Sequence, residues 1–245
     1  MSLITEYKDK DGDIFRVIVP GAGPVRAVDL RVPLLGENDR LAEGNRGYFR
    51  ERGILALNLV SSPGAGKTAL LERTLDRFGR EIPCAVLVGD LETDRDAQRL
   101  RREHVPVAQI TTCGACHLDA GMVARGTEAL DLDGVRVLFI ENVGNLVCPA
   151  AFDLGEAIRV VLLSTTEGED KPLKYPPIFK SAHVVLVTKA DLVKPLGFDL
   201  EAALENIRLI APQARVLTVS SRTGQGMEAW YDLLRGELLS RHEPL

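Results

Sequence analysis

Seven short apolar segments occur along the chain after residue 53, and segments with helical periodicity separate most of them. They are rich in Val, Ile and Leu and do not alternate with polar residues, which is typical of strands buried on both faces. The expected strands are residues 54–60, 84–88, 107–110, 135–140, 158–163, 184–187 and 216–219, and the expected helices follow Lys67 and cover 94–102, 118–130, 200–209 and 227–239. This alternation predicts an α/β fold with a mainly parallel sheet of about seven strands and helices on both faces.

The first 52 residues have a different pattern. Polar turns are expected at 9–13 and 21–24, and apolar residues among charges predict a moderately amphipathic helix over 37–50. We therefore expect an N-terminal extension, residues 1–52, packed on a main domain of residues 53–245.

Composition limits the class of protein. Hydrophobic residues make up 45% of the 245 residues and charged residues 27%, as in ordinary globular proteins. The net charge of −5 argues against a general nucleic-acid binder. No apolar run approaches a membrane span, and the N-terminus lacks the pattern of a signal peptide. We expect a cytoplasmic protein with no nucleic-acid or membrane partner, whose four cysteines are thiols or metal ligands.

A glycine-rich turn joins the first expected strand to the helix after it. Gly64 and Gly66 allow the backbone to bend around an anion, Lys67 supplies charge for the outer phosphates, and the Thr68 hydroxyl suits Mg²⁺. Ser61 stands where the usual phosphate-binding loop has its first glycine. An ordinary βα turn is the simpler alternative, but the Gly-Lys-Thr sequence after a strand favours a nucleoside triphosphate site formed by Gly64, Ala65, Gly66, Lys67, Thr68 and Ala69.

Two acidic residues end other apolar strands. Asp90 follows the second strand and Glu141 the fourth, and in parallel sheets ligands bind at this edge. We therefore expect Lys67, Asp90 and Glu141 to take part in catalysis, and Thr68, Asp90 and Glu141 to hold Mg²⁺. Glu141-x-x-Gly144 resembles the Asp-x-x-Gly element of GTPases, whose glycine senses the γ-phosphate.

Later strand ends indicate guanine as the base. Thr188-Lys189-Ala190-Asp191 resembles the Asn-Lys-x-Asp element, and the Asp191 carboxylate can accept from guanine N1–H and the exocyclic amine. The Lys189 stem can cover the ring face. Thr188 replaces the usual Asn, which leaves one supporting hydrogen bond open. Val219-Ser220-Ser221-Arg222-Thr223-Gly224 resembles the Ser-Ala-Lys element beside the base, and we expect Ser221 and Arg222 to contact the nucleotide. The three elements together favour GTP over ATP; a small-molecule kinase is the alternative.

One loop combines thiols with an imidazole. Cys116 and His117 open an expected helix, and Cys148 follows the Glu141–Gly144 element, so the three could provide mixed S/N ligation for Zn²⁺ or Ni²⁺. Cys113 is either a fourth ligand or uninvolved. Buried structural thiols are the alternative, and we expect this for Cys84. No metal role is assigned to His104, His183 or His242.

These motifs resemble the HypB family of GTPases, which help to insert nickel into [NiFe] hydrogenase. The resemblance rests on residues 116–120, 141–150 and 166–176 and extends over nearly the whole chain. It implies a P-loop domain of the dimeric SIMIBI type, slow, switch-like GTP hydrolysis, and nickel or zinc held by Cys116, His117 and Cys148 near a homodimer interface. It also implies a nickel metallochaperone partner and the hydrogenase large subunit as recipient.

The chain departs from this family in its extension, which contains none of the cysteines or histidines that form a nickel store in many members. Pro63 stands where some dimeric relatives carry a lysine, so a lysine acting in trans from that position is excluded. Besides the small-molecule kinase, the alternatives are a urease-type nickel-insertion GTPase and a regulatory GTPase with structural cysteines. The water-activating residue is not assigned.

Overall fold

The computed structural model describes residues 3–8, 14–19, 31–90, 95–112 and 114–241. The chain divides into two compact units, Met1–Leu34 and Leu35–Leu245. In the smaller unit, β1 (Leu3–Lys8) pairs antiparallel with β2 (Ile14–Val19), and Leu3 lies opposite Val19. The sequence pattern did not predict this strand pair. The polar turns expected at 9–13 and 21–24 lie outside the described residues.

The larger unit is built on a seven-stranded sheet whose strands are all parallel, in the order β5-β4-β6-β3-β7-β8-β9. Its strands are β3 (Leu55–Ser61), β4 (Cys84–Asp90), β5 (Val107–Thr111), β6 (Val137–Glu141), β7 (Ile158–Ser164), β8 (Val184–Thr188) and β9 (Arg215–Thr218). All seven expected strands are present, with ends shifted by at most two residues. Because the strands are parallel, the last residues of β3, β4, β6 and β8 lie at the same edge of the sheet; they are Ser61, Asp90, Glu141 and Thr188.

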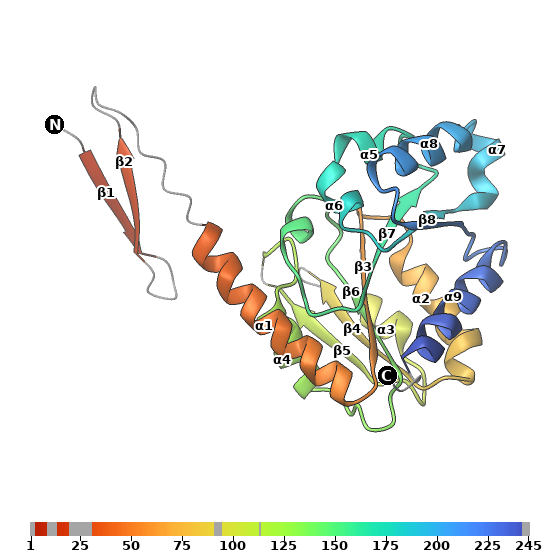
Figure 1. The fold of residues 1–245 in the computed structure, drawn as a ribbon, viewed down its shortest axis with the longest axis horizontal. Coiled ribbons are helices and arrows are strands. Elements are labelled where there is room, and N and C mark those ends of the chain that lie inside the picture. Colours follow the sequence, from red (N-terminus) through yellow and green to blue (C-terminus); the bar gives the residue numbers. More distant parts are fainter. Residues whose placement is uncertain (1–2, 9–13, 20–30, 91–94, 113, 242–245) are drawn as a thin grey trace. The chain divides into compact units, whose positions relative to one another are not determined.

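Helices cover both faces of this sheet, as expected (Figure 1). The helices are α1 (Arg31–Glu51), α2 (Lys67–Arg77), α3 (Arg95–Leu100), α4 (Ala120–Glu128), α5 (Lys171–Lys174), α6 (Pro176–Lys180), α7 (Val193–Leu196), α8 (Leu200–Ile210) and α9 (Met227–Ser240), with 3₁₀ turns η1 (Phe78–Arg80), η2 (Cys148–Ala151) and η3 (Ala190–Leu192). The short helices α5, α6 and α7 were not anticipated. Across the described residues, no helix has the length and apolar character that crossing a membrane requires.

Successive residues of β3 point to opposite faces and join different parts of the core. Leu57 and Leu59 pack in a cluster with side chains of α2 and α9, whereas Ala56 packs in another with Phe49 of α1 and Val123 of α4. Phe49 is buried, so this part of α1 belongs to the core of the larger unit. Most of the helix that the sequence placed in the extension therefore lies beyond the division at residue 34.

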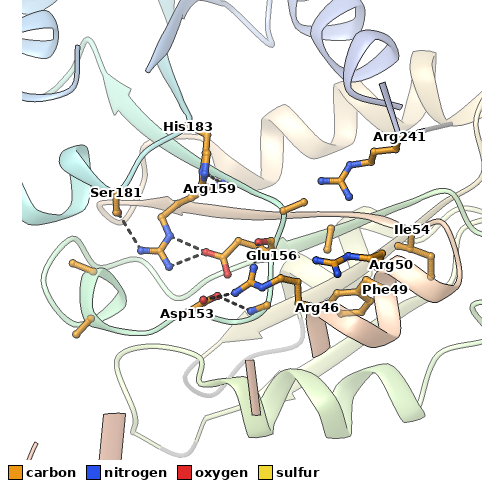
Figure 2. A pocket seen from close by; sticks show the side chains of 15 residues that line it. Arg46, Phe49, Arg50, Ile54, Asp153, Glu156, Arg159, Ser181, His183 and Arg241 are labelled. Carbon is orange, nitrogen blue, oxygen red and sulfur yellow. Dashed lines mark hydrogen bonds and ion pairs between the residues drawn. The ribbon is translucent and has the colours of Figure 1, made fainter. Parts of the chain in front are cut away.

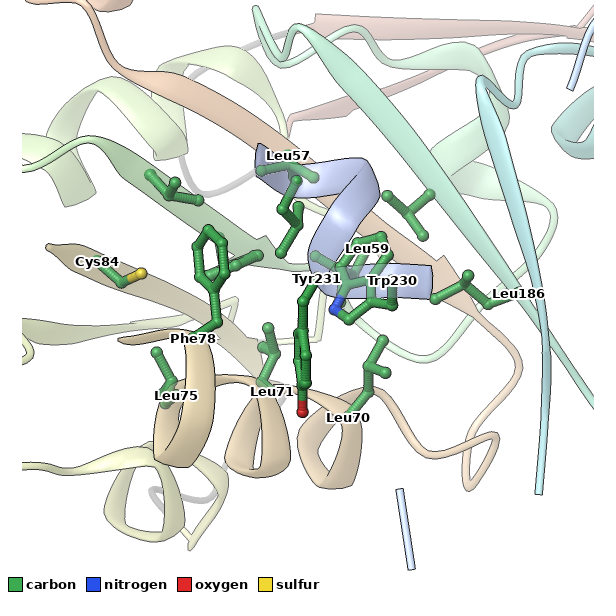
Figure 3. Packing of buried hydrophobic residues seen from close by; sticks show 14 of the residues in the cluster. Leu57, Leu59, Leu70, Leu71, Leu75, Phe78, Cys84, Leu186, Trp230 and Tyr231 are labelled. Atoms are coloured by element: carbon green, nitrogen blue, oxygen red, sulfur yellow. The ribbon is translucent and has the colours of Figure 1, made fainter. Parts of the chain in front are cut away.

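The α2–α9 side of the core contains two large aromatic side chains of α9 (Figure 3). The Trp230 indole donates to Thr74 Oγ1 over 3.0 Å, and the Thr74 hydroxyl donates to the Leu70 carbonyl over 2.7 Å. Tyr231 stacks on Phe78, with 6.4 Å between ring centroids. These contacts fix α2 behind β3, and the first residue of α2 is Lys67 of the glycine-rich loop.

Candidate functional site

The loop between β3 and α2 has the backbone that the sequence requires. Gly64 and Gly66 adopt φ values of 73° and 100°, in the region that favours glycine, and α2 begins directly at Lys67. The loop borders a cleft of about 520 Å³ at the carboxyl edge of the sheet. Its lining residues are Pro63, Gly64, Gly66, Lys67, Thr68, Ala69, Gly89, Asp90, Asp96, Arg99, Glu141, Asn142, Val143, Gly144 and Lys189.

Ser61, the departure from the usual loop pattern, has a specific contact. Its buried side chain accepts a hydrogen bond of 3.1 Å from Lys67 Nζ and donates one of 2.7 Å to the Ser62 carbonyl. Burial lowers the pKa of Lys67, while the carboxylates of Glu141, Asp96 and Glu167 act in the opposite direction. The Lys67 ammonium is thus held at the cleft by the neutral Ser61 hydroxyl, which phosphate oxygens could replace as its hydrogen-bond acceptor.

The residues expected to hold Mg²⁺ lie side by side. The Thr68 hydroxyl donates to Glu141 Oε1 over 2.7 Å, and Glu141 Oε2 is buried with no hydrogen-bond partner in the described part of the chain. Burial raises the pKa of Glu141 to about 7, against the opposing effects of Lys67 and the Thr68 hydrogen bond. A buried carboxylate oxygen without a donor beside a threonine hydroxyl fits a hard divalent cation. Asp90, the third expected ligand, lines the same cleft.

Gly144, which the sequence predicts to sense the γ-phosphate, lies against the glycine-rich loop. A Cβ added at this residue would lie 2.9 Å from Pro63 Cα, so only glycine fits without displacement. The cleft is also lined by Asp96 and Arg99 of α3, for which no role was predicted from the sequence. Their only signal was the position of an expected helix after a strand that ends in Asp90.

Two residues expected to contribute to guanine binding, Thr188 and Lys189, donate hydrogen bonds to the glycine-rich loop. Thr188 Oγ1 donates to the Ala65 carbonyl over 2.7 Å, so the residue in place of the usual Asn contacts the glycine-rich loop. Lys189, in the left-handed region at φ 57°, donates through Nζ to the Gly64 carbonyl over 2.8 Å. Asp191 Oδ1 accepts from the Ser220 hydroxyl over 2.6 Å, so Ser220 orients the acid.

Ser221 and Arg222 lie elsewhere in this structure. They line a separate cavity of about 410 Å³ together with Arg73, Arg102 and neighbouring residues, and they do not border the main cleft. Ser220 of the same element donates to Asp191, a contact that the sequence did not predict. The sequence signal was the strand end itself, which fixes the loop but not the side chain that points inward.

Cys116, His117 and Cys148 come together as expected. Their ligand atoms lie within 4.8 Å of one another, with 2.9 Å between the two Sγ atoms and 3.9 Å from Cys116 Sγ to His117 Nδ1. Two thiols and an imidazole, all partly exposed, form a donor set suited to Zn²⁺ or Ni²⁺ and leave a coordination position open. Cys113 lies outside the described residues.

The surroundings of the three ligands affect their protonation. The hydrogen bond with Cys116 is the main cause that raises the pKa of Cys148. Burial lowers the pKa of His117, whose ring packs on Phe152 with 4.0 Å between centroids. By contrast, Cys84 is enclosed in β4, and burial raises the pKa of its thiol to about 12. The prediction that Cys84 is a core residue is confirmed.

Comparison with known proteins gives the family. Residues 55–218 match the model of the CobW/HypB/UreG nucleotide-binding domain. The chain is 52% identical over 216 residues to the hydrogenase maturation factor HypB of Azotobacter chroococcum mcd 1, which covers 88% of this chain and 70% of that protein. The chain belongs to the HypB family. The family is one of GTPases, so the expected fold and enzyme class are confirmed.

Solved structures of HypB agree with this assignment. HypB from Archaeoglobus fulgidus has a TM-score of 0.78 and 42% identity, with 83% of this chain and 99% of that chain covered. HypB from Helicobacter pylori, in complex with nickel, has a TM-score of 0.79 and 38% identity, with 85% and 98% covered. In this family fold, the cleft and the thiol–imidazole cluster are joined by one stretch of chain, from Glu141 to Cys148.

Proposed function

We propose that this chain is a cytoplasmic, GTP-hydrolysing metallochaperone that binds nickel or zinc and assists nickel insertion into [NiFe] hydrogenase. The observation that carries the proposal is the position of Cys148, four residues after Gly144 and 2.9 Å from Cys116 Sγ. Gly144 contacts the phosphate-binding loop, so a change at the γ-phosphate can reach a metal ligand through three intervening residues.

The nucleotide site acts by positioning and charge. Backbone N–H groups at the start of α2 and the Lys67 ammonium would bind the phosphates. Asp191, which lines a neighbouring cavity with Ala190 and Lys194, would select guanine. Thr68, Glu141 and Asp90 would hold Mg²⁺, which when bound neutralises charge on the β- and γ-phosphates. Gly144 would donate its amide to the γ-phosphate, and hydrolysis would release the segment that follows it.

Base selectivity gives one test of this site. Wild-type protein should bind GTP and GDP and reject ATP in a competition assay with a fluorescent guanine nucleotide. Asp191→Asn should weaken GTP binding and improve binding of xanthosine triphosphate, because the amide can donate to the xanthine oxygen that replaces the guanine amine. A preference of the wild-type protein for ATP would instead support a small-molecule kinase.

Metal binding gives the second test. Ni²⁺ and Zn²⁺ are titrated into the protein with GDP and with a non-hydrolysable GTP analogue, and molecular mass is measured on the same samples. We expect different affinities in the two nucleotide states and a homodimer in one of them, with metal binding lost in Cys116→Ala and Cys148→Ala. Cys84→Ala is the matched control, because this buried thiol should not bind metal. Equal behaviour in both states would exclude a metal switch.

The partners follow from the proposed role. A nickel metallochaperone would deliver the metal, and the hydrogenase large subunit would receive it. Affinity capture with the wild-type protein in each nucleotide state, followed by mass spectrometry, tests both. Recovery of urease subunits in place of hydrogenase would favour the urease-type alternative.

A further inference from the structure

Two asparagine side chains hold the backbone on either side of His117. Asn142 Oδ1 accepts a hydrogen bond of 3.0 Å from the Leu118 amide, and Asn145 Nδ2 donates one of 3.3 Å to the Cys116 carbonyl. Both asparagines belong to the stretch between Glu141 and Cys148. The peptide that carries His117 is therefore tied at both ends to the segment that begins at the nucleotide cleft.

Asn142 also belongs to that cleft. It follows Glu141, whose carboxylate accepts from Thr68, and its Oδ1 accepts a second hydrogen bond of 2.9 Å from the Val143 amide. Gly144, two residues later, packs against Pro63 of the phosphate-binding loop. One side-chain oxygen thus joins the backbone beside the γ-phosphate sensor to the backbone beside a metal ligand.

Hydrogen bonds behind Asn142 fix the direction in which its amide points. Its Nδ2 donates to Asn58 Oδ1 over 3.2 Å, and Asn58 Nδ2 donates to Glu156 Oε1 over 3.1 Å. At one end, the backbone amides of Leu118 and Val143 can only donate, and at the other end the Glu156 oxygen that pairs with Arg159 accepts. Both asparagine amides therefore have one orientation that satisfies every partner.

Glu156 is itself held at the far end of these bonds. The Arg159 guanidinium forms an ion pair with Glu156 Oε1 at 2.7 Å, and the Leu154 amide donates to Oε2 over 2.8 Å. Figure 2 shows this pair, with Arg159 also donating to Ser181. The side chains of Arg159 and Glu156 are only 8% and 3% exposed, so a reversed Asn58 amide would place its oxygen against a buried carboxylate oxygen.

Leu118 is held from the side of β4 as well. Its side chain is fully buried and occupies the space beside Gly89, where an added Cβ would lie 2.7 Å from Leu118 Cγ. Gly89 precedes Asp90, which lines the cleft. The Leu118 backbone can therefore adjust to a movement of Asn142 mainly by carrying the adjoining His117 peptide with it.

We propose that Asn142, assisted by Asn145, is the positioning residue through which the nucleotide state reaches the metal site. The inference rests on the function proposed above. When γ-phosphate contact displaces the segment after Glu141, the hydrogen bonds to Leu118 and Cys116 transmit that displacement to His117 and Cys116. The ligands then change position relative to Cys148, and the metal affinity changes with them.

The experiment measures the ratio of the Ni²⁺ dissociation constants with saturating GDP and with a saturating non-hydrolysable GTP analogue. Nickel–thiolate absorption reports both the affinity and the ligand geometry. In the wild-type protein we expect the ratio to differ from one by about 5- to 150-fold, the usual range of such couplings. In Asn142→Ala the two dissociation constants should differ by about twofold or less, and in Asn145→Ala the difference should be smaller than in the wild-type protein.

Controls separate coupling from loss of structure. Thr74→Val removes another buried hydrogen-bonding side chain, on the α2–α9 side of the core, and should keep the wild-type ratio and absorption spectrum. If Asn142→Ala does not fold, Asn58→Leu and Asn145→Ala, at a partly exposed residue, replace it in the test. Both substitutions should bring the ratio of the dissociation constants closer to one. Thermal unfolding identifies variants that have simply lost stability.

The outcomes distinguish the two proposals. A wild-type ratio of one, or nickel binding that survives Cys116→Ala, would overturn the proposed function itself. A wild-type ratio far from one that persists in Asn142→Ala would leave that function standing and overturn the role of Asn142. An equal loss in Thr74→Val would also overturn it, because general destabilisation would then explain the effect.

Discussion

The Thr68 hydroxyl donates to one oxygen of the buried Glu141 carboxylate, and the other oxygen has no hydrogen-bond partner among the described residues. One hydroxyl is too little to offset the removal of a carboxylate from water, which is why burial raises the pKa of Glu141 to about 7. In the protein without Mg²⁺ and nucleotide, Glu141 should therefore bind a proton more tightly when folded than when unfolded.

This relationship predicts a pH dependence of stability. Because the pKa rises from 4.5 to about 7 on folding, the free energy of unfolding should fall by about 3 kcal/mol as pH rises through this window. Glu141→Gln should lack this component, so the difference between the two urea-unfolding curves isolates it. Mg²⁺ with GDP should reverse the trend in the wild-type protein, because the ion needs the ionised carboxylate. Parallel pH profiles for the two proteins would show that Glu141 does not titrate in this range.

Ser61 should matter more in the absence of nucleotide than in its presence. Ser61→Ala removes the acceptor of the Lys67 ammonium, at a cost of about 1 kcal/mol in unfolding free energy. Phosphate oxygens of bound GDP would replace that acceptor, so the cost should shrink when nucleotide is saturating. Urea unfolding with and without GDP measures both values, and an equal cost in both states would argue against a direct role of Ser61 toward Lys67.

The sheet could be predicted from the sequence because its strands are short, uniformly apolar runs, and burial on both faces selects that pattern directly. The carboxyl ends of the strands then located Asp90, Glu141 and Asp191 without any knowledge of side-chain contacts. The β1–β2 pair was missed, since its strands precede the alternating pattern on which the fold assignment rested.

The hydrogen-bond partners of buried side chains could not be predicted from the sequence. Asn58 is a polar residue inside an otherwise apolar stretch of strand, and its partners Asn142 and Glu156 are 84 and 98 residues away. Nothing local indicates such a bond. The role of Ser220 was missed for a related reason. The end of the strand shows where the loop lies, but the φ/ψ angles of the loop decide whether the hydroxyl of Ser220 or that of Ser221 points toward Asp191.

Thr188 should support nucleotide binding through the loop rather than through the base. Thr188→Val keeps the shape of this buried side chain but leaves the Ala65 carbonyl without its donor. If the binding free energy falls by about 1 kcal/mol, GDP and GTP should both bind about fivefold more weakly. Thr188→Ser keeps the hydroxyl and should retain most of the affinity. Titration of a fluorescent GDP checks this, and a loss confined to GTP would contradict it.

Gly144 should tolerate no side chain while nucleotide is sensed. In Gly144→Ala the new Cβ would lie 2.9 Å from Pro63 Cα and 3.1 Å from Pro63 N, so either the sensor segment or the phosphate-binding loop must move. We expect GTP hydrolysis to fall at least about tenfold, as for the loss of one transition-state contact. Gly236→Ala on α9 is the matched control, because an added Cβ there meets no atom of the described residues within 4 Å. That substitution should leave hydrolysis unchanged and stabilise the helix by about 0.5–1 kcal/mol. Single-turnover hydrolysis and thermal unfolding of both variants provide the measurement, and wild-type turnover in Gly144→Ala would remove Gly144 from the sensor.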